Sequence, residues 1–139
     1  MPVKLSLIVP CYNEEKTLAG IVERILAIRR PELELEIVIV DDCSADRSRE
    51  IAAALAAEHP EILLAAHEVN QGKGAALRTG FLRATGDFVG IQDADLEYDP
   101  ADYHLMLEPL LEGRADVVFG SRYLRPDTRR VLYFWHTWM

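Results

Sequence analysis

The chain has 139 residues, half of them hydrophobic and 27% charged, which suffices for the core of one domain and excludes a disordered tail. The 23 acidic residues outnumber the 15 basic ones, so the net charge is −8, and this disfavours nucleic acid as the main partner because binding a polyanion needs surplus lysine and arginine. Cys11 and Cys43 stand far apart, with no CxxC or histidine pair at zinc spacing, which indicates a reducing compartment and no structural zinc.

Short β-branched runs alternate with helical patterns from the start of the chain, which is typical of βαβ units and a mostly parallel sheet. The first predicted strand is Leu5–Val9, and a helix capped by Asn13 is predicted after it. Its apolar face repeats at helical spacing and comprises Leu18, Ile21, Val22 and Ile25. We expect this helix to end near Arg30 and Pro31, since proline does not continue a helix.

The same alternation continues through the rest of the chain. Further strands are predicted over Glu36–Val40, Ile62–Ala66, Asp87–Ile91 and Ala115–Phe119. Helices are predicted around Ile51 and Leu55, over Ala75–Ala84, and after the cap Asp99 and first-turn Pro100. The apolar face of the last helix comprises Tyr103, Met106, Leu107 and Leu110. Pro109 lies inside that pattern, so it should kink this helix or end it early. The fold class is therefore α/β, an open and mostly parallel sheet flanked by helices.

Ligands of such sheets bind outside the carboxyl ends of the strands, and several polar motifs of this chain follow predicted strands there. The loop Gly72–Gly74 has neither common nucleotide fingerprint. Leu77 stands where a dinucleotide motif needs glycine, and Gly74, not Ser or Thr, follows Lys73. A phosphate-binding loop and a flexible turn that opens a helix are both consistent with it.

Asp93 and Asp95 follow the fourth predicted strand, with Glu97 two residues further on. Carboxylates at this spacing can converge on a hard divalent cation such as Mg²⁺ or Mn²⁺, which in turn holds a diphosphate. An isolated Asp-x-Asp pair is more often a solvated turn that caps the next helix. The spacing alone therefore leaves the metal site as one of two interpretations.

Other polar residues also allow two interpretations. Asp42 could accept hydrogen bonds from a base or ribose, or it could only support the next helix. Pro10 and Tyr12 could wall a base pocket or simply pack, and Arg122 could clamp a phosphate or form a surface ion pair. The histidines are interpreted as surface or core residues; they are His59, His67, His104 and His136.

Five motifs together resemble the family 2 glycosyltransferases, and within them most closely the dolichol- or polyprenyl-phosphate sugar transferases. The motifs are Val9–Glu14, Ile39–Asp46, Asn70–Ala75, Gln92–Glu97 and Gly120–Tyr123. The resemblance runs from about Val3 to Tyr123 and implies the GT-A fold. It also implies a nucleotide-sugar-binding domain over residues 1–125. Residues 126–139 would begin an apolar, aromatic element, either membrane-facing or part of a core, and we expect the chain to be cut from a longer protein.

The resemblance also implies roles for individual residues. A nucleotide pocket would be lined by Pro10, Tyr12, Asn13, Glu14, Asp42, Lys73 and Asp93. Mg²⁺ or Mn²⁺ would be held by Asp93, Asp95 and Glu97, the last standing where close relatives often have glutamine. Asp95 and Arg122 would be the catalytic residues.

The activity implied is metal-dependent, inverting transfer of mannose or glucose from a nucleotide-diphospho-sugar to a polyprenyl or dolichyl phosphate. Such a chain would work in the cytoplasm, peripherally at the inner face of the membrane, and a homodimer is left open. Alternatives are a non-catalytic nucleotide-sugar-binding module and a glycosyltransferase that uses a saccharide hydroxyl as acceptor. A sugar-phosphate nucleotidyltransferase is disfavoured because Cys11–Glu14 lacks the Gly- and Arg-rich loop such an enzyme needs after its first strand.

Overall fold

The computed structural model describes residues 2–94 and 99–118, and these form two compact units that divide between Leu96 and Glu97. The first unit holds β1 (Val3–Cys11), α1 (Leu18–Leu26), β2 (Leu33–Asp41), α2 (Ser48–Glu58), β3 (Ile62–Ala66), α3 (Lys73–Arg83) and β4 (Phe88–Ile91). The second holds the 3₁₀ turn η1 (Pro100–Asp102) and α4 (Tyr103–Leu111). The domain boundary predicted at residue 125 lies outside the described residues and stays a prediction.

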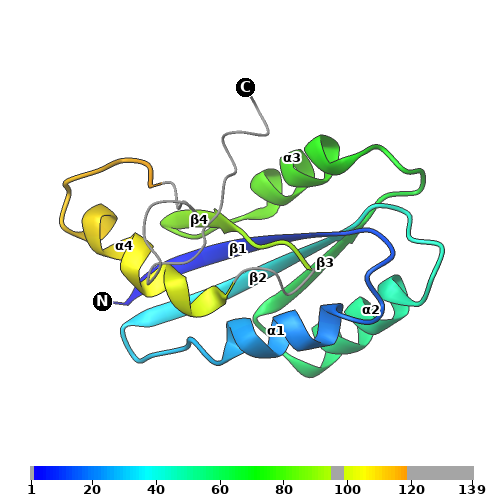
Figure 1. Ribbon diagram of the computed structural model, residues 1–139, viewed down its shortest axis with the longest axis horizontal. Helices are drawn as coiled ribbons and strands as arrows, with labels where there is room; N and C mark the ends of the chain where they lie inside the picture. Colours follow the sequence, from blue (N-terminus) through cyan, green and yellow to red (C-terminus); the bar gives the residue numbers. More distant parts are fainter. Residues whose placement is uncertain (1, 95–98, 119–139) are drawn as a thin grey trace. The chain divides into compact units, whose positions relative to one another are not determined.

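The four strands form one parallel sheet in the order β3-β2-β1-β4, which confirms the predicted open parallel α/β sheet. The chain first moves outward from β1 to β2 and β3, then crosses back over to place β4 on the other side of β1. Because parallel crossovers are right-handed, α1 and α2 cover one face of the sheet and α3 covers the other (Figure 1).

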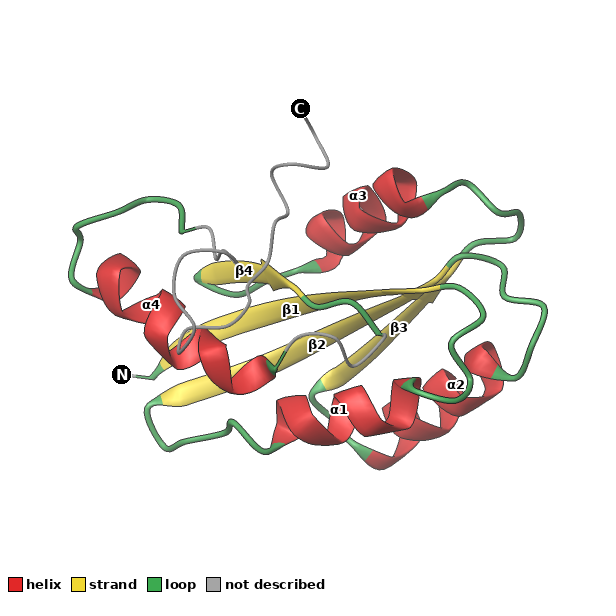
Figure 2. Ribbon diagram, viewed as in Figure 1, coloured by secondary structure: helices red, strands yellow, loops and turns green. Residues whose placement is uncertain are grey.

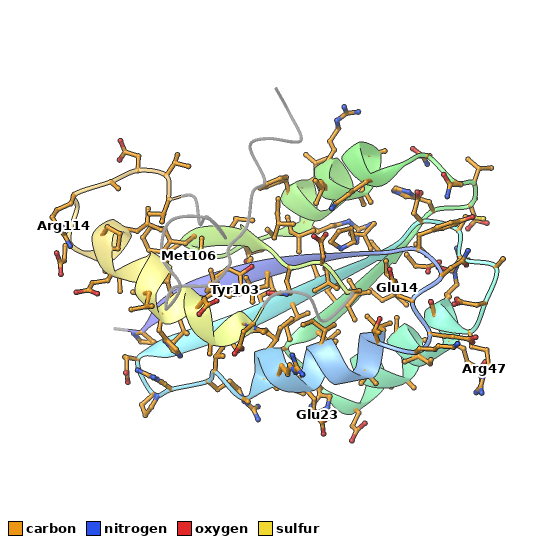
Figure 3. The ribbon with its side chains drawn as sticks, in the orientation of Figure 1. Glu14, Glu23, Arg47, Tyr103, Met106 and Arg114 are labelled. Carbon is orange, nitrogen blue, oxygen red and sulfur yellow. The ribbon has the colours of Figure 1, made fainter. Side chains whose placement is uncertain are left out.

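The core follows from strands that are apolar on both sides. Residues 5–9 of β1 and 37–41 of β2 are all buried, as expected for a sheet with helices on both faces. The four predicted apolar residues of α1 are buried, while Glu23 on the same helix points away from the sheet (Figure 3). On the other face, α3 approaches β1 closely at Gly80, where any side chain would collide with Ile8.

The ends of α1 differ from the prediction. Asn13 is not the N-cap, so that prediction is wrong: the helix starts at Leu18 after Thr17, and Asn13 has a left-handed backbone with φ of 53°. The helix also ends earlier than expected, at Leu26. The N–H groups of Ile28 and Arg29 bond to carbonyls three residues back, so the chain leaves the helix through tight turns.

The second unit begins as predicted. The Asp99 carboxylate accepts a hydrogen bond from the Ala101 N–H at 3.0 Å, and α4 then runs to Leu111, two residues beyond Pro109. The strand predicted over Ala115–Phe119 is wrong for residues 115–118, which form no strand; Phe119 lies outside the described residues. No helix in the described ranges has the length and apolar character to cross a membrane.

Candidate functional site

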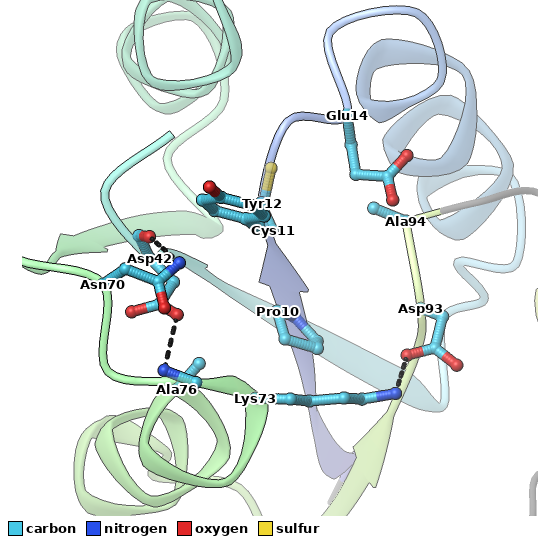
Figure 4. Close-up of a pocket in the computed structure, with 11 residues that line it drawn as sticks. Pro10, Cys11, Tyr12, Glu14, Asp42, Asn70, Lys73, Ala76, Asp93 and Ala94 are labelled. Atoms are coloured by element: carbon cyan, nitrogen blue, oxygen red, sulfur yellow. Dashed lines mark hydrogen bonds and ion pairs between the residues drawn. The ribbon is translucent and has the colours of Figure 1, made fainter. Parts of the chain in front are cut away.

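A cavity of about 440 Å³ lies at the carboxyl edge of the sheet, around the ends of β1, β2 and β4. The loops that follow β1, β2 and β3 emerge at this edge (Figure 2). The strand order reverses between β1 and β4, and open α/β sheets bind ligands at such a point. The lining residues are Pro10, Cys11, Tyr12, Glu14, Asp42, Asn70, Gly72, Lys73, Ala76, Asp93 and Ala94 (Figure 4).

Asp42 is the most deeply buried acid of this cavity, with 3% of its surface exposed. Its carboxylate accepts hydrogen bonds from the N–H groups of Gln71 and Gly72, both at 2.9 Å, and lies 2.7 Å from His67 Nδ1. Burial raises the pKa of Asp42, but these hydrogen bonds outweigh it and the net pKa lies below the ordinary value. Asp42 is therefore an ionised acceptor that fixes the loop before α3.

The neighbouring Asp41 has a different role. It is fully buried, and its Oδ2 accepts hydrogen bonds from the Ser44 N–H at 3.2 Å and from Arg49 Nε at 3.1 Å. Its Oδ1 has no hydrogen-bond partner among the described residues. Of the two adjacent acids, Asp41 thus supports the β2–α2 connection, while Asp42 lines the cavity.

Lys73 and Asp93 meet across the cavity from two different elements. Lys73 is the first residue of α3, Asp93 follows β4, and the Lys73 Nζ lies 2.7 Å from Asp93 Oδ1 (Figure 4). Half of the Lys73 side chain and a quarter of the Asp93 side chain are exposed. Because both charged groups are open to solvent, their ion pair can exchange for a ligand at little cost.

Among the described residues, the lining of the cavity carries more negative than positive charge. They supply the carboxylates of Glu14, Asp42 and Asp93 and one cationic side chain, Lys73. A diphosphate would be repelled by this set unless a cation entered with it. Carboxylate oxygens are donors that suit Mg²⁺ or Mn²⁺ rather than a softer metal, so the chemistry of Asp93 fits the predicted ion.

The remaining walls are aromatic or apolar. The Tyr12 side chain is 50% exposed beside the cavity, and Pro10 and Ala76 also contribute to the lining. Burial raises the pKa of the Cys11 thiol to about 11, so this cysteine is a neutral wall group and not a nucleophile. Cys11 and Cys43 are both free thiols. An exposed aromatic ring next to a buried acceptor is a suitable platform for a flat heterocycle.

Asn13 belongs to a second cluster at this edge, which we call the loop clamp: Asn13, Glu14, Glu15, Ser44, Asp46 and Ser48. The Asn13 Oδ1 accepts a hydrogen bond from the Ala45 N–H at 2.8 Å, and its own N–H donates to Ser44 Oγ at 3.0 Å. The Glu14 N–H donates to Ser48 Oγ at 2.8 Å. These bonds tie the β1–α1 loop to the β2–α2 loop.

The structure brings together six of the seven residues predicted for the nucleotide pocket, and Asn13 alone is absent from the lining. Asp95, Glu97 and Arg122 lie outside the described residues, so their metal-binding and catalytic roles stay predictions. Across the described ranges no group of three or more His, Cys, Asp or Glu is placed to hold a metal.

Sequence reasoning missed some residues of the site. Asn70 lines the cavity, and its side-chain amide donates to the Asp42 carbonyl oxygen at 3.3 Å. His67 bonds the Asp42 carboxylate from behind and was assigned no role beyond surface or core. One signal was available: His67 is the first residue after an apolar strand, at the edge where the other polar groups gather.

Residues 6–137 match the family described as glycosyl transferase family 2. The chain is 42% identical over 138 residues to dolichyl-phosphate beta-glucosyltransferase ALG5A of Trichomonas vaginalis, a match that covers 92% of this chain and 43% of that protein. It is 35% identical over 123 residues to a dolichol-phosphate mannosyltransferase of Pyrococcus furiosus, covering 88% of this chain and 34% of that protein. The chain thus spans less than half the length of these relatives.

A solved structure supports the same relationship. Mannosyltransferase PcManGT of Pyrobaculum calidifontis, in complex with GDP-Man and Mn²⁺, matches with a TM-score of 0.66 at 30% identity, covering 86% of this chain and 34% of that one. The GT-A fold expected from the motifs is therefore confirmed.

Proposed function

Because the chain belongs to glycosyl transferase family 2, we propose that its cavity binds a nucleotide-diphospho-sugar, from which mannose or glucose passes to a polyprenyl or dolichyl phosphate. The observation that carries this proposal is the cavity itself, which combines the buried acceptor Asp42, the exposed Tyr12 ring and the Lys73–Asp93 pair at the strand-order reversal. Relatives named for dolichyl-phosphate glucosyl and mannosyl transfer support the choice of sugar and acceptor.

The nucleoside would lie between β1 and the loop before α3. Tyr12 offers a ring face, and the Asp42 carboxylate accepts hydrogen bonds without being able to donate any. It therefore suits an N–H group of a base or a hydroxyl group of a ribose. GDP and UDP both carry such donors, so both remain candidates.

The diphosphate would lie toward Lys73 and Asp93. Lys73 would leave Asp93 and turn its ammonium to the phosphate oxygens, which frees Asp93 to act as a metal ligand together with Asp95 and Glu97. Mg²⁺ or Mn²⁺, when bound, neutralises the negative charge that grows on the departing nucleotide. The presence of Mn²⁺ and GDP-Man in the Pyrobaculum calidifontis complex supports this assignment.

In the proposed reaction, a phosphate oxygen of the acceptor forms a bond to the anomeric carbon while the bond from that carbon to the donor diphosphate breaks. The nucleoside diphosphate leaves with the electron pair, and the anomeric configuration inverts. The acceptor is already an anion, so no general base is required, whereas a saccharide hydroxyl acceptor would need a carboxylate poised to take its proton. Arg122 is proposed to contact the phosphates, and the lipid acceptor implies work at a membrane surface on the cytoplasmic side.

The first test is calorimetric titration of the purified chain with GDP, UDP and their sugar conjugates, with and without Mn²⁺. Saturable binding of one nucleotide that tightens with Mn²⁺ is expected. A nucleotide affinity that is the same with and without Mn²⁺ would contradict the metal-dependent mechanism and favour a non-catalytic binding module. Failure of every nucleotide to bind would contradict the donor site in this chain.

Asp95→Ala provides the matched test of the metal. We expect it to abolish the gain in donor affinity from Mn²⁺ while the thermal unfolding midpoint stays within a few degrees of wild type. A variant that binds donor normally in the presence of Mn²⁺ would remove Asp95 from the metal site. An assay of transfer to a short-chain polyprenyl phosphate, in which the released nucleoside diphosphate is measured, then tests the acceptor.

A further inference from the structure

His67 lies behind the cavity and contributes nothing to its lining. It is the first residue after β3 and is 8% exposed. Its backbone is held from two directions: the His67 N–H donates to the Asp41 carbonyl oxygen at 2.8 Å, and Arg49 Nη2 donates to the His67 carbonyl oxygen at 2.6 Å. The ring therefore projects from a fixed anchor.

Both ring nitrogens of His67 have side-chain partners. Nδ1 lies 2.7 Å from Asp42 Oδ1, and Nε2 lies 2.8 Å from the Thr79 hydroxyl oxygen on α3. Because the Asp42 carboxylate is ionised and can only accept, Nδ1 must carry the hydrogen of this bond. In the neutral ring, Nε2 then accepts a hydrogen bond from the Thr79 hydroxyl. The ring thus joins the end of β2 to the body of α3.

The Asp42 carboxylate, which His67 bonds, has two roles. It lines the cavity, and it receives the N–H groups of Gln71 and Gly72. Gly72 has φ of 92°, a conformation that glycine tolerates and other residues rarely adopt, and Lys73 follows it directly. A rotation of the Asp42 carboxylate would therefore disturb both the acceptor offered to the nucleoside and the start of α3.

We propose that His67 is a positioning residue of the nucleotide site, which holds the Asp42 carboxylate and the loop Asn70–Gly72 in the arrangement that receives a nucleoside diphosphate. The inference rests on the proposed function. A buried histidine needs partners for both ring nitrogens whatever its role. What indicates a positioning role is the identity of one partner: Nδ1 bonds the Asp42 carboxylate, which lines the cavity and receives the loop N–H groups, whereas the Thr79 bond satisfies the other nitrogen.

Two substitutions of His67 test its bonds to Asp42 and Thr79 separately. In His67→Asn the amide nitrogen can stand near the place of Nδ1, which keeps the bond to Asp42 and loses Thr79. In His67→Gln the amide reaches toward Thr79 and the bond to Asp42 is lost. Thr79→Val is the matched control that removes the Thr79 bond alone. We expect His67→Gln to weaken UDP or GDP binding by about tenfold, with His67→Asn and Thr79→Val within about threefold of wild type.

A second measurement reports on the loop without any ligand. Amide hydrogen exchange of Gln71 and Gly72 should speed up in His67→Gln and remain near the wild-type rate in His67→Asn. Equal affinity and equal exchange in the two variants would overturn the proposal, even if both melt at lower temperature, because that pattern is what a packing role gives. If the wild-type chain binds no nucleotide, the proposed function fails and the inference with it. A wild type that binds, alongside a His67→Gln variant that binds equally well, overturns the inference alone.

Discussion

Two polar clusters lie side by side at the carboxyl edge of the sheet, and they use their polar groups in opposite ways. In the loop clamp, the side-chain oxygens of Asn13 and Asp46 accept hydrogen bonds from backbone N–H groups. Some of these N–H groups belong to the facing loop and one belongs to the same loop as Asp46. In the cavity, Lys73 and Asp93 pair across open space and remain partly exposed. The hydrogen bonds of the loop clamp stabilise the fold, while the cavity keeps charged groups that a ligand can reach.

Asp42 stands between these two patterns, since it holds a loop and also lines the cavity. Each carboxylate oxygen has two lone pairs, so three protein donors leave one acceptor position for a ligand. A buried, ionised acceptor with one position left is a costly arrangement unless a partner fills it. This difference between clamp and cavity gives distinct expectations for substitutions only a few residues apart.

The largest expected effect is the loss of Asp42. Asp42→Ala should weaken nucleotide binding by about a hundredfold, with or without metal, because it removes a charged hydrogen-bond acceptor and releases the loop before α3. Asp46→Ala is the matched control from the loop clamp: it should lower the unfolding midpoint and leave the dissociation constant of the folded chain unchanged. Calorimetric titration measures both variants. An Asp42→Ala variant that titrates like wild type would remove Asp42 from the binding site.

Lys73→Gln should produce two effects of opposite sign. Removing the ammonium should weaken UDP or GDP by about tenfold but leave the nucleoside unaffected, because only the phosphates would contact this side chain. The same change frees Asp93 from its ion pair, so Mn²⁺ alone should bind a few-fold more tightly, as measured by electron paramagnetic resonance. Arg78→Gln removes an exposed charge from the same helix and should change neither value. Equal losses for nucleoside and nucleotide would contradict the phosphate role.

Much of the fold could be predicted from the sequence because its signals are local and repeated. The apolar runs of β1 and β2 indicate strands by their short length and β-branched residues, and the spacing of Leu18, Ile21 and Ile25 indicates a helix by its period. The two errors were non-local. Asn13 is typical of a helix cap, but its bonds go to residues more than thirty positions away. The segment 115–118 has the composition of a strand but does not form one, since composition alone does not determine whether a segment pairs in a sheet.

The site was predictable to the extent that it follows strand ends. Pro10, Tyr12 and Asp93 come directly from that rule, and the motifs added Lys73. His67 could not be identified from the sequence as a residue of the site, because its place there depends on a bond to Asp42, twenty-five residues away, and on a bond to Thr79 in the next helix. Hydrogen bonds between the ends of different strands leave no periodic trace in the sequence.

Asn13 tests whether the loop clamp takes part in binding, since the motifs predict that it binds nucleotide and the structure places it in the loop clamp. Asn13→Ala should cost about 1 kcal/mol of folding free energy, which lowers the unfolding midpoint by a few degrees, with nucleotide affinity unchanged. Asn13→Asp keeps the acceptor oxygen and tolerates the left-handed backbone, so it should behave like wild type. Thermal unfolding measures the expected loss of stability, and calorimetric titration measures the nucleotide affinity. A selective loss of affinity in Asn13→Ala would assign Asn13 to the nucleotide after all.

The smallest effect is in the pH dependence of stability, where the two clusters should act alike. Hydrogen bonds outweigh burial and hold the pKa of Asp42 and of Asp46 below the ordinary value. A carboxyl group with a lowered folded pKa stabilises the fold fully above its unfolded pKa of about 4, and this contribution disappears as the pH falls through the folded value. Stability in urea should therefore be flat from pH 7 to 5 and fall below pH 4.

Asp42→Asn and Asp46→Asn should each make that acid decline shallower, while Glu68→Gln, an exposed residue outside both clusters, controls for the change in charge. Since each group loses its stabilising bonds on protonation, the amide variants start less stable at pH 7 and converge with wild type near pH 2. Parallel curves for wild type and Asp42→Asn would mean that the carboxylate is not held in the ionised form by Gln71 and Gly72. The cavity would then lack the fixed acceptor that distinguishes it from the loop clamp.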